Sequence, residues 1–141
     1  MGERGTVSEP RRLRQLLFFA WILVIFALSS VPHTTLSRWN LGIPAAWGHF
    51  LEYGLLGVFW YRWRSSAGSI GWTEWLPGVV WAALIAGLDE LYQSLVPGRV
   101  SEWRDGLVDM VGFLIGAMAT AVASRKLREL RKNPVEYEGE S

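Results

Sequence analysis

The feature that most constrains this chain is the uneven distribution of its charged residues. The 37 residues from Gln15 to Leu51 contain one formal charge, Arg38, whereas the 17 residues from Arg125 to Ser141 contain nine. Averaged over all 141 residues, charged side chains make up an ordinary 19% and the net charge is +1. Long uncharged stretches beside polar tails are typical of membrane proteins. We therefore expect one membrane-embedded domain rather than a soluble one.

The composition also excludes several other kinds of protein. The chain has no cysteine, which rules out a disulfide framework, a zinc ribbon and a thiol nucleophile. Its nearly balanced charge lacks the basic excess of a nucleic-acid-binding protein. We expect neither a nucleic-acid partner nor a cofactor.

Four apolar runs are each about one bilayer long, and residues that break helices separate them. The third connection is predicted to turn at Pro97-Gly98. The predicted fold is all-α, a polytopic bundle of four transmembrane helices over residues 15–124, with an N-terminal tail at 1–14 and a C-terminal tail at 125–141. The four runs are Leu16–Val31, Trp47–Trp63, Trp75–Leu95 and Gly106–Ala123.

The first run has a second interpretation, as a cleaved signal peptide whose basic start is Arg11, Arg12 and Arg14. Its length and its aromatic residues favour a retained span, because the apolar core of a signal peptide is usually shorter. Cleavage would leave the topology of the other three runs unchanged.

The basic residues predict the orientation. Eleven of the 14 Lys and Arg residues lie in the two tails and in the connection between the second and third runs. The positive-inside rule then places both termini of this multi-pass protein in the cytoplasm. The tryptophans near the run ends are interpreted as anchors at the membrane interface. They are Trp39, Trp47, Trp60, Trp63, Trp72, Trp75 and Trp103.

The polar residues inside the runs gather at the level that this orientation turns outward. They are His49, Glu52, Tyr53, Asp89, Glu90, Gln93, Asp105 and Asp109. An ionised carboxylate near the bilayer centre costs roughly 2.5–3.5 kcal/mol, so such residues are expected to be paired. We expect Arg99 and Arg104 to pair with Glu90 and Asp109, in a polar pocket that opens toward the outer leaflet.

Helical spacing predicts which residues of each run face the bundle interior, because positions three or four apart share a face. Small residues on those faces allow membrane helices to approach closely. Asp89 lies about 100° around its helix from Glu90 and is not assigned to the interior. The predicted inward faces of the third and fourth runs are Ala83, Ala86, Gly87, Glu90, Gln93 and Ser94, and Asp105, Asp109, Gly112, Gly116 and Thr120. On the second run, the residues that share one face are His49, Glu52, Tyr53, Leu56 and Trp60.

The stretch from Asp89 to Gly116 resembles the VanZ-like membrane proteins, and the resemblance extends from about Trp21 to Ala123. That family's pattern is Glu-x-x-Gln, a Pro and then an Arg in a short loop, an Asp six residues after the Arg, an Asn or Asp four further on, and then Gly. A His and a Tyr four residues apart lie in its second span. The matching residues are Glu90, Gln93, Pro97, Arg99, Asp105, Asp109, Gly112, His49 and Tyr53.

The resemblance implies a multi-pass protein of the bacterial cytoplasmic (inner) membrane with a role at its outer face. The best-known member of the family is associated with reduced sensitivity to the glycopeptide teicoplanin, which acts there on cell-wall precursors. The resemblance implies no particular reaction. This chain departs from its pattern in having Asp109 where Asn is commoner, and the additional acid would favour a bound cation or a protonated neighbour.

Two functions remain open from the residues. In the first, the pocket binds a membrane lipid headgroup or a lipid-linked envelope precursor, with Arg99 holding a phosphate or carboxylate. Such a binding site requires no nucleophile. Its residues would be His49, Tyr53, Glu90, Gln93, Arg99, Asp105 and Asp109.

In the second, the protein is an intramembrane enzyme acting on a lipid-linked substrate, with Glu90 or Asp109 as general base and His49 as acid-base partner. One variant adds a divalent cation held by His49, Glu90 and Asp109. The sequence shows no metal-ligand spacing, so no metal site is assigned.

Three further interpretations concern the bundle itself. A purely structural polar cluster that joins the helices is the third alternative. Transport is disfavoured, because the cytoplasmic halves of the runs are apolar. The small-residue ridges are also compatible with a homodimer.

Overall fold

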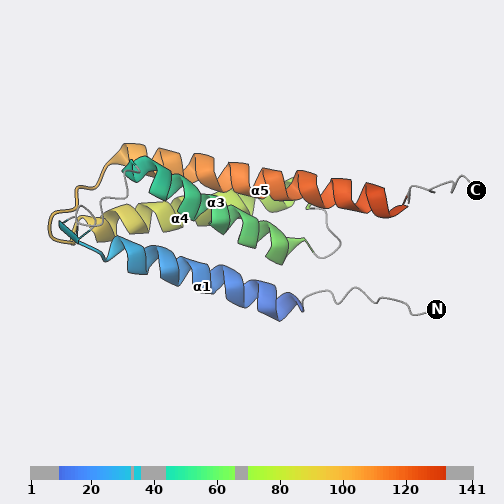
Figure 1. Cartoon of the computed structure of the whole chain (residues 1–141), viewed down its shortest axis with the longest axis horizontal. Helices are drawn as coiled ribbons and strands as arrows, with labels where there is room; N and C mark the ends of the chain where they lie inside the picture. The colour runs from blue at the N-terminus through green and yellow to red at the C-terminus, as the bar shows by residue number, and fades with distance from the viewer. Residues whose placement is uncertain (1–9, 33, 36–43, 66–69, 133–141) are drawn as a thin grey trace, which may run out of the picture.

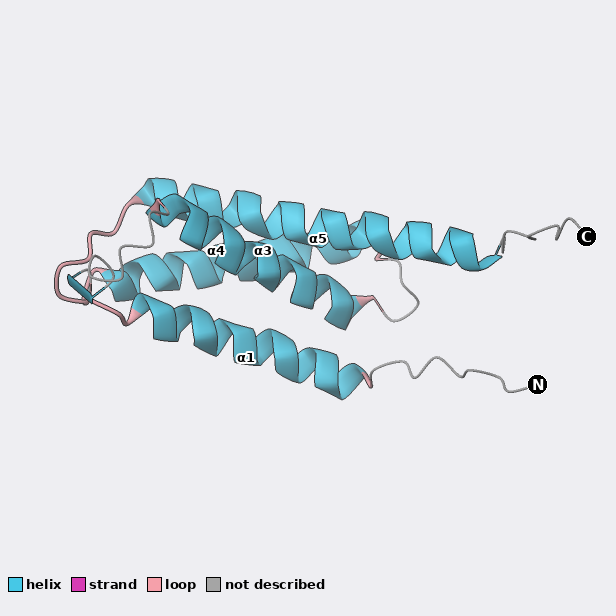
Figure 2. Ribbon diagram, viewed as in Figure 1, coloured by secondary structure: helices cyan, strands magenta, loops and turns pink. Residues whose placement is uncertain are grey.

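The computed structural model describes residues 10–32, 34–35, 44–65 and 70–132, and their regular structure is helical throughout (Figure 2). Each of the four predicted runs falls on one long helix, so the all-α fold is confirmed. The last helix continues nine residues past Ala123, into the segment assigned to the C-terminal tail. The four helices are α1 (Arg11–Ser29), α3 (Ala45–Arg64), α4 (Trp72–Gln93) and α5 (Trp103–Lys132).

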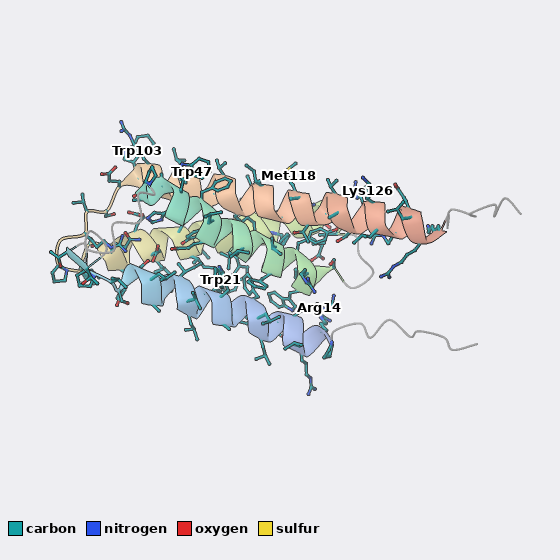
Figure 3. The ribbon with its side chains drawn as sticks, in the orientation of Figure 1. Arg14, Trp21, Trp47, Trp103, Met118 and Lys126 are labelled. Atoms are coloured by element: carbon teal, nitrogen blue, oxygen red, sulfur yellow. The ribbon has the colours of Figure 1, made fainter. Side chains whose placement is uncertain are left out.

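The helices form an elongated bundle in which α1 and α4 run in one direction and α3 and α5 in the other (Figure 1). Arg14 and Lys126 lie toward one end of the bundle, and Trp47 and Trp103 lie at the other (Figure 3). We call the first the basic end, where α1 starts and α5 finishes. The second, where α3 and α5 start, is called the acidic end. Arg14 ties α1 to the basic end of α3, since its Nη1 donates to the carbonyl oxygen of Arg62 at 2.9 Å.

The turn after α4 forms where proline and glycine predict it. The backbone N–H of Arg99 donates to the carbonyl oxygen of Val96 at 3.1 Å, which closes a four-residue turn around Pro97 and Gly98. Gly98 has a φ of 78°. Proline followed by a left-handed glycine is the signature of a type II turn, and a side chain at the glycine position would strain the backbone. The turn brings the end of α4 close to the start of α5.

Glycines set the distance between α3 and α5. A Cβ on Gly116 would fall on the carbonyl oxygen of Gly54, and a Cβ on Gly57 would fall on that of Phe113. A Cβ on Gly112 would likewise meet the carbonyl oxygen of Phe50. The two backbones are therefore in direct contact, as the GxxxG spacing of α5 predicts. The small-residue ridge of α5 therefore packs against α3 of the same chain.

The predicted inward face of α5 is confirmed, but that of α4 is wrong by about one residue. The shared face predicted on α3 also lies toward the interior. Ala83, Gly87 and Ser94 are exposed, and Asp89 is fully buried. Bulky aliphatic residues take the outward side of α4, so the ridge opposite them faces the core. The buried ridge is Gly78, Ala82, Ile85, Ala86, Asp89 and Gln93. The exposed ridge is Leu76, Val80, Leu84, Leu88, Leu91 and Leu95.

Trp60 is a core residue and not an interface anchor. Its side chain is 1% exposed and packs against Trp75 and Phe113, with ring centroids 5.7 and 5.6 Å away. The ring also covers Gly78, where a Cβ would collide with it. In contrast, Trp47 and Trp103 are mostly exposed, as expected of anchors. Trp39 lies outside the described residues.

Large apolar side chains cover the outside of the bundle on all four helices. On α5 they recur every three or four residues, at Leu107, Val111, Ile115, Met118 and Val122. By length and composition, α1 and α5 are apolar enough to cross a membrane. The helices α3 and α4 fall short of that criterion. The prediction of four long helices is therefore confirmed, and the prediction that all four cross a membrane is not.

Candidate functional site

The polar residues of α3, α4 and α5 converge inside the acidic end of the bundle. Because α3 and α5 start there, the second turn of α3 and the first two turns of α5 lie at the same level. The last two turns of α4 reach that level from the opposite direction (Figure 1). We use the name acidic cluster for His49, Asp89, Glu90, Asp105 and Asp109.

His49 lies at the centre of the acidic cluster. Its Nδ1 is 3.1 Å from Oδ1 of Asp109, and its Nε2 is 3.8 Å from Oδ2 of Asp105. The His49 side chain is 8% exposed and that of Asp109 is not exposed at all. The first distance is that of a hydrogen bond, and the second is too long for one. The close packing of α3 on α5 therefore holds the Nδ1 edge of the imidazole against a buried carboxylate.

Asp89 is the polar residue whose inward position the sequence interpretation missed. It is fully buried, and one of its oxygens, Oδ2, accepts a hydrogen bond from Nε2 of Gln93 at 3.0 Å. The same amide nitrogen lies 3.3 Å from Oγ of Ser29 at the end of α1. Gln93 therefore orients Asp89 and links α4 to α1. The leucine ridge on the other side of α4 is the sequence signal that could have identified Asp89.

Glu90 lies beside the core rather than within it. Its Oε2 accepts hydrogen bonds from the Ser101 hydroxyl and the backbone N–H of Glu102, both at 2.9 Å. These bonds hold the start of the segment leading into α5 against the end of α4. Ligand atoms of His49, Glu90 and Asp105 lie within 4.8 Å of one another, and those of His49, Asp89 and Asp109 do so as well.

Several oxygens of the site are buried without a hydrogen-bond partner in the described part of the chain. They are Oδ1 of Asp89, Oε1 of Glu90, Oδ2 of Asp109 and the hydroxyl of Tyr53. Leaving one such group buried and unsatisfied costs about 1–3 kcal/mol, and more when it is charged. These oxygen atoms are therefore close together and available to a hydrogen-bond donor or a cation.

The predicted pairing of Arg99 and Arg104 with Glu90 and Asp109 is wrong. Arg99 instead caps α1: its Nε donates to the Val31 carbonyl oxygen and its Nη2 to that of Leu28, each at 3.2 Å. The last carbonyls of a helix are unpaired and carry a partial negative charge, which attracts a guanidinium. Arg104 lies over the ring of Trp103, with 5.9 Å from Cζ to the ring centroid.

A groove of about 370 Å³ runs along the surface between α4 and α5 and reaches the acidic cluster. Its walls are mostly apolar, and Glu90 and Ser101 supply polar groups. A Cβ on either Gly87 or Gly106 would meet no atom within 4 Å, so these glycines leave the groove wide. The lining residues are Ala83, Ala86, Gly87, Glu90, Ser101, Trp103, Gly106 and Met110.

Comparison with known proteins gives one match. A family model described as VanZ/LLP1 matches residues 4–124, which include every helix except the last turns of α5. No curated protein and no solved structure matches the chain.

Proposed function

The chain belongs to the VanZ/LLP1 family, and on that basis and that of its packing we propose that it is an integral protein of the bacterial cytoplasmic membrane with four spans. The lengths and the outer surfaces of α3 and α4 support four spans. At 1.5 Å per residue, the 20 residues of α3 and the 22 of α4 extend about 30–33 Å, enough to cross the hydrocarbon core. In the middle of α3, Tyr53 is fully buried and Glu52 is half-buried. Residues 78–88 of α4 carry no charged side chain, and the exposed faces of both helices carry leucines.

The charges support one orientation of this bundle. The basic end holds Arg14, Arg62 and Arg64 together with the lysines and arginines at the end of α5. An excess of basic residues marks the cytoplasmic side of a membrane protein. Both chain ends are then cytoplasmic, and the acidic cluster and the groove lie in the outer half of the membrane.

We propose that the groove and the cluster together bind an amphipathic ligand of the outer leaflet, either a lipid headgroup or a lipid-linked envelope precursor. The observation that carries this proposal is the position of Glu90, which lines the apolar groove and also belongs to the acidic cluster. The hydrocarbon part of such a ligand fits the groove, and its polar part reaches the cluster. The best-known member of the family is associated with reduced sensitivity to teicoplanin, which also acts at this face, and we propose the same link for this chain.

The proposal predicts that filling the groove displaces the ligand. In Gly87→Leu the new side chain enters the groove, because a Cβ at Gly87 meets only open space. We expect native mass spectrometry of the purified protein to find a lipid retained by the unmodified chain and at least tenfold depleted in this variant. Val80→Leu, on the exposed ridge of α4 outside the groove, is the matched control and should retain the lipid.

Two results would contradict ligand binding in the groove. One is equal retention of the lipid by Gly87→Leu and Val80→Leu. The other is the absence of any specifically retained lipid from the unmodified protein, which would favour a cluster that only joins the helices. Arg99→Gln should keep its lipid, since Arg99 caps α1 and does not line the groove.

The alternative function is an intramembrane enzyme that acts on a lipid-linked substrate. The observation that favours it is the 3.1 Å contact between His49 Nδ1 and Asp109, because a carboxylate that orients an imidazole is a common acid-base arrangement. In this proposal Asp109→Asn would keep the ligand and abolish its turnover.

A further inference from the structure

The acidic cluster buries more negative charge than its described neighbours balance. Asp89 and Asp109 are both fully buried, and each has one oxygen without a hydrogen-bond partner. Even a protonated His49 would balance only one of the two carboxylates. Arg99, in the adjoining turn, acts on Asp89 through space, but its guanidinium N–H groups donate to α1 carbonyls and not to a carboxylate. Among the described residues, the four carboxylates of the cluster therefore face at most two cations, Arg99 and a protonated His49. Burying an unpaired carboxylate is costly enough that such groups normally have a cationic partner or a metal ion.

The geometry of the innermost three residues suits a metal ion. Oxygens of Asp89 and Asp109 and a ring nitrogen of His49 all lie within 4.8 Å of one another. His49 Nδ1 and Asp109 Oδ1 are 3.1 Å apart. An ion about 2.1 Å from both atoms would see them at an angle of about 90°, which is an ordinary angle between ligands.

The neighbouring contacts orient these ligands in the way metal sites require. Gln93 holds Oδ2 of Asp89 at 3.0 Å and leaves Oδ1 free. The Nε2 side of His49 faces Asp105 at 3.8 Å, so a second carboxylate lies behind the ring when Nδ1 binds the metal. Carboxylates and amides placed behind the ligands fix their orientation and increase their affinity.

We propose that His49, Asp89 and Asp109 bind one divalent transition-metal ion. A set of one imidazole nitrogen with two carboxylates favours Mn²⁺ or Zn²⁺ over Mg²⁺ and Ca²⁺, which prefer oxygen ligands alone. The ion offsets the charge of the two buried carboxylates. The site goes beyond the proposed lipid binding, because it is complete within α3, α4 and α5 and does not depend on what the groove holds.

The test uses the full chain in detergent, stripped with a chelator and then dialysed against Mn²⁺ or Zn²⁺. Elemental analysis should find about one ion per unmodified chain, with Asp89→Asn and Asp109→Asn each weakening the affinity tenfold or more. Glu52→Gln is the matched control, since it removes one negative charge one turn from His49 but lies outside both groups of ligand atoms. It should bind the ion as the unmodified chain does.

A spectroscopic measurement on the unmodified protein tests the same proposal without relying on variants that fail to fold. Electron-nuclear double resonance of the Mn²⁺-loaded chain should show coupling to a directly bound nitrogen, which only His49 supplies within this cluster. Three results would overturn the proposal: no stoichiometric binding of either ion, no nitrogen coupling in the loaded protein, or binding that is lost in Glu90→Gln and Asp105→Asn but retained in Asp89→Asn. The last would place the ion on the Nε2 side of His49.

Discussion

Replacing Trp60 with alanine is expected to destabilise the protein by about 2–4 kcal/mol. The Trp60 ring is 1% exposed and fills the space between Gly78, Trp75 and Phe113. Removing a buried tryptophan leaves a cavity that neighbouring side chains only partly refill. Within a membrane, burying an apolar side chain removes little surface from water, so the loss of stability comes mainly from lost packing contacts. The expected loss is therefore smaller than the largest values for soluble proteins.

The measurement is the free energy of unfolding in mild detergent, from an SDS titration followed by circular dichroism. Trp81→Ala is the matched control, because the Trp81 side chain is 46% exposed on the outside of α4. It should change stability by less than about 0.5 kcal/mol. A Trp60→Ala variant as stable as Trp81→Ala would contradict the packing of α3 against α4 and α5.

The second large effect is expected from Gly116→Ala, with a loss of about 1–3 kcal/mol. The added methyl group would fall on the carbonyl oxygen of Gly54. That atom belongs to the backbone of α3, so it cannot rotate away as a side chain would. The helices α3 and α5 must move apart, which also lengthens the contact between His49 and Asp109. We therefore expect the same variant to lose metal affinity.

The control for Gly116→Ala is the same substitution ten residues earlier on the same helix. A Cβ at Gly106 meets no atom within 4 Å. Alanine is a better helix former than glycine by up to about 1 kcal/mol, so Gly106→Ala should be neutral or stabilising. Opposite signs for the two variants, from the SDS titration, would support the direct backbone contact. Equal effects would show that helix propensity alone explains both.

The helices could be predicted from sequence because they depend on local patterns. Apolar runs, helix-breaking connections and the Pro97-Gly98 turn each signal a boundary within a few residues. The inward ridge of α5 was also predictable, since GxxxG indicates close packing by itself. The ridge of α4 was not, because small residues occur on two of its sides and only the leucines opposite Asp89 distinguish them.

The partners of the site residues depend on tertiary structure and were harder to predict. Charge alone suggests that Arg99 pairs with Glu90 or Asp109, which are near it in sequence. The end of α1 lies more than sixty residues away in the chain, and the carbonyl oxygens of Leu28 and Val31 there accept hydrogen bonds from Arg99 instead. Trp60 was misassigned for a similar reason, since a tryptophan near a helix end can be an anchor or can pack against a glycine on a neighbouring helix.

Labelling of single cysteines tests the central claim most directly, since the chain contains no cysteine of its own. Gly71 is exposed directly before α4, and Val100 is exposed in the connection that follows α4. A cysteine at each position, probed with a membrane-impermeant maleimide, reports which side of the membrane it occupies. If α4 spans the membrane with the acidic cluster outside, Val100→Cys reacts in intact cells and Gly71→Cys reacts only after lysis. Equal reactivity at the two positions, or the reverse order, would contradict a membrane-spanning bundle with an outward-facing site.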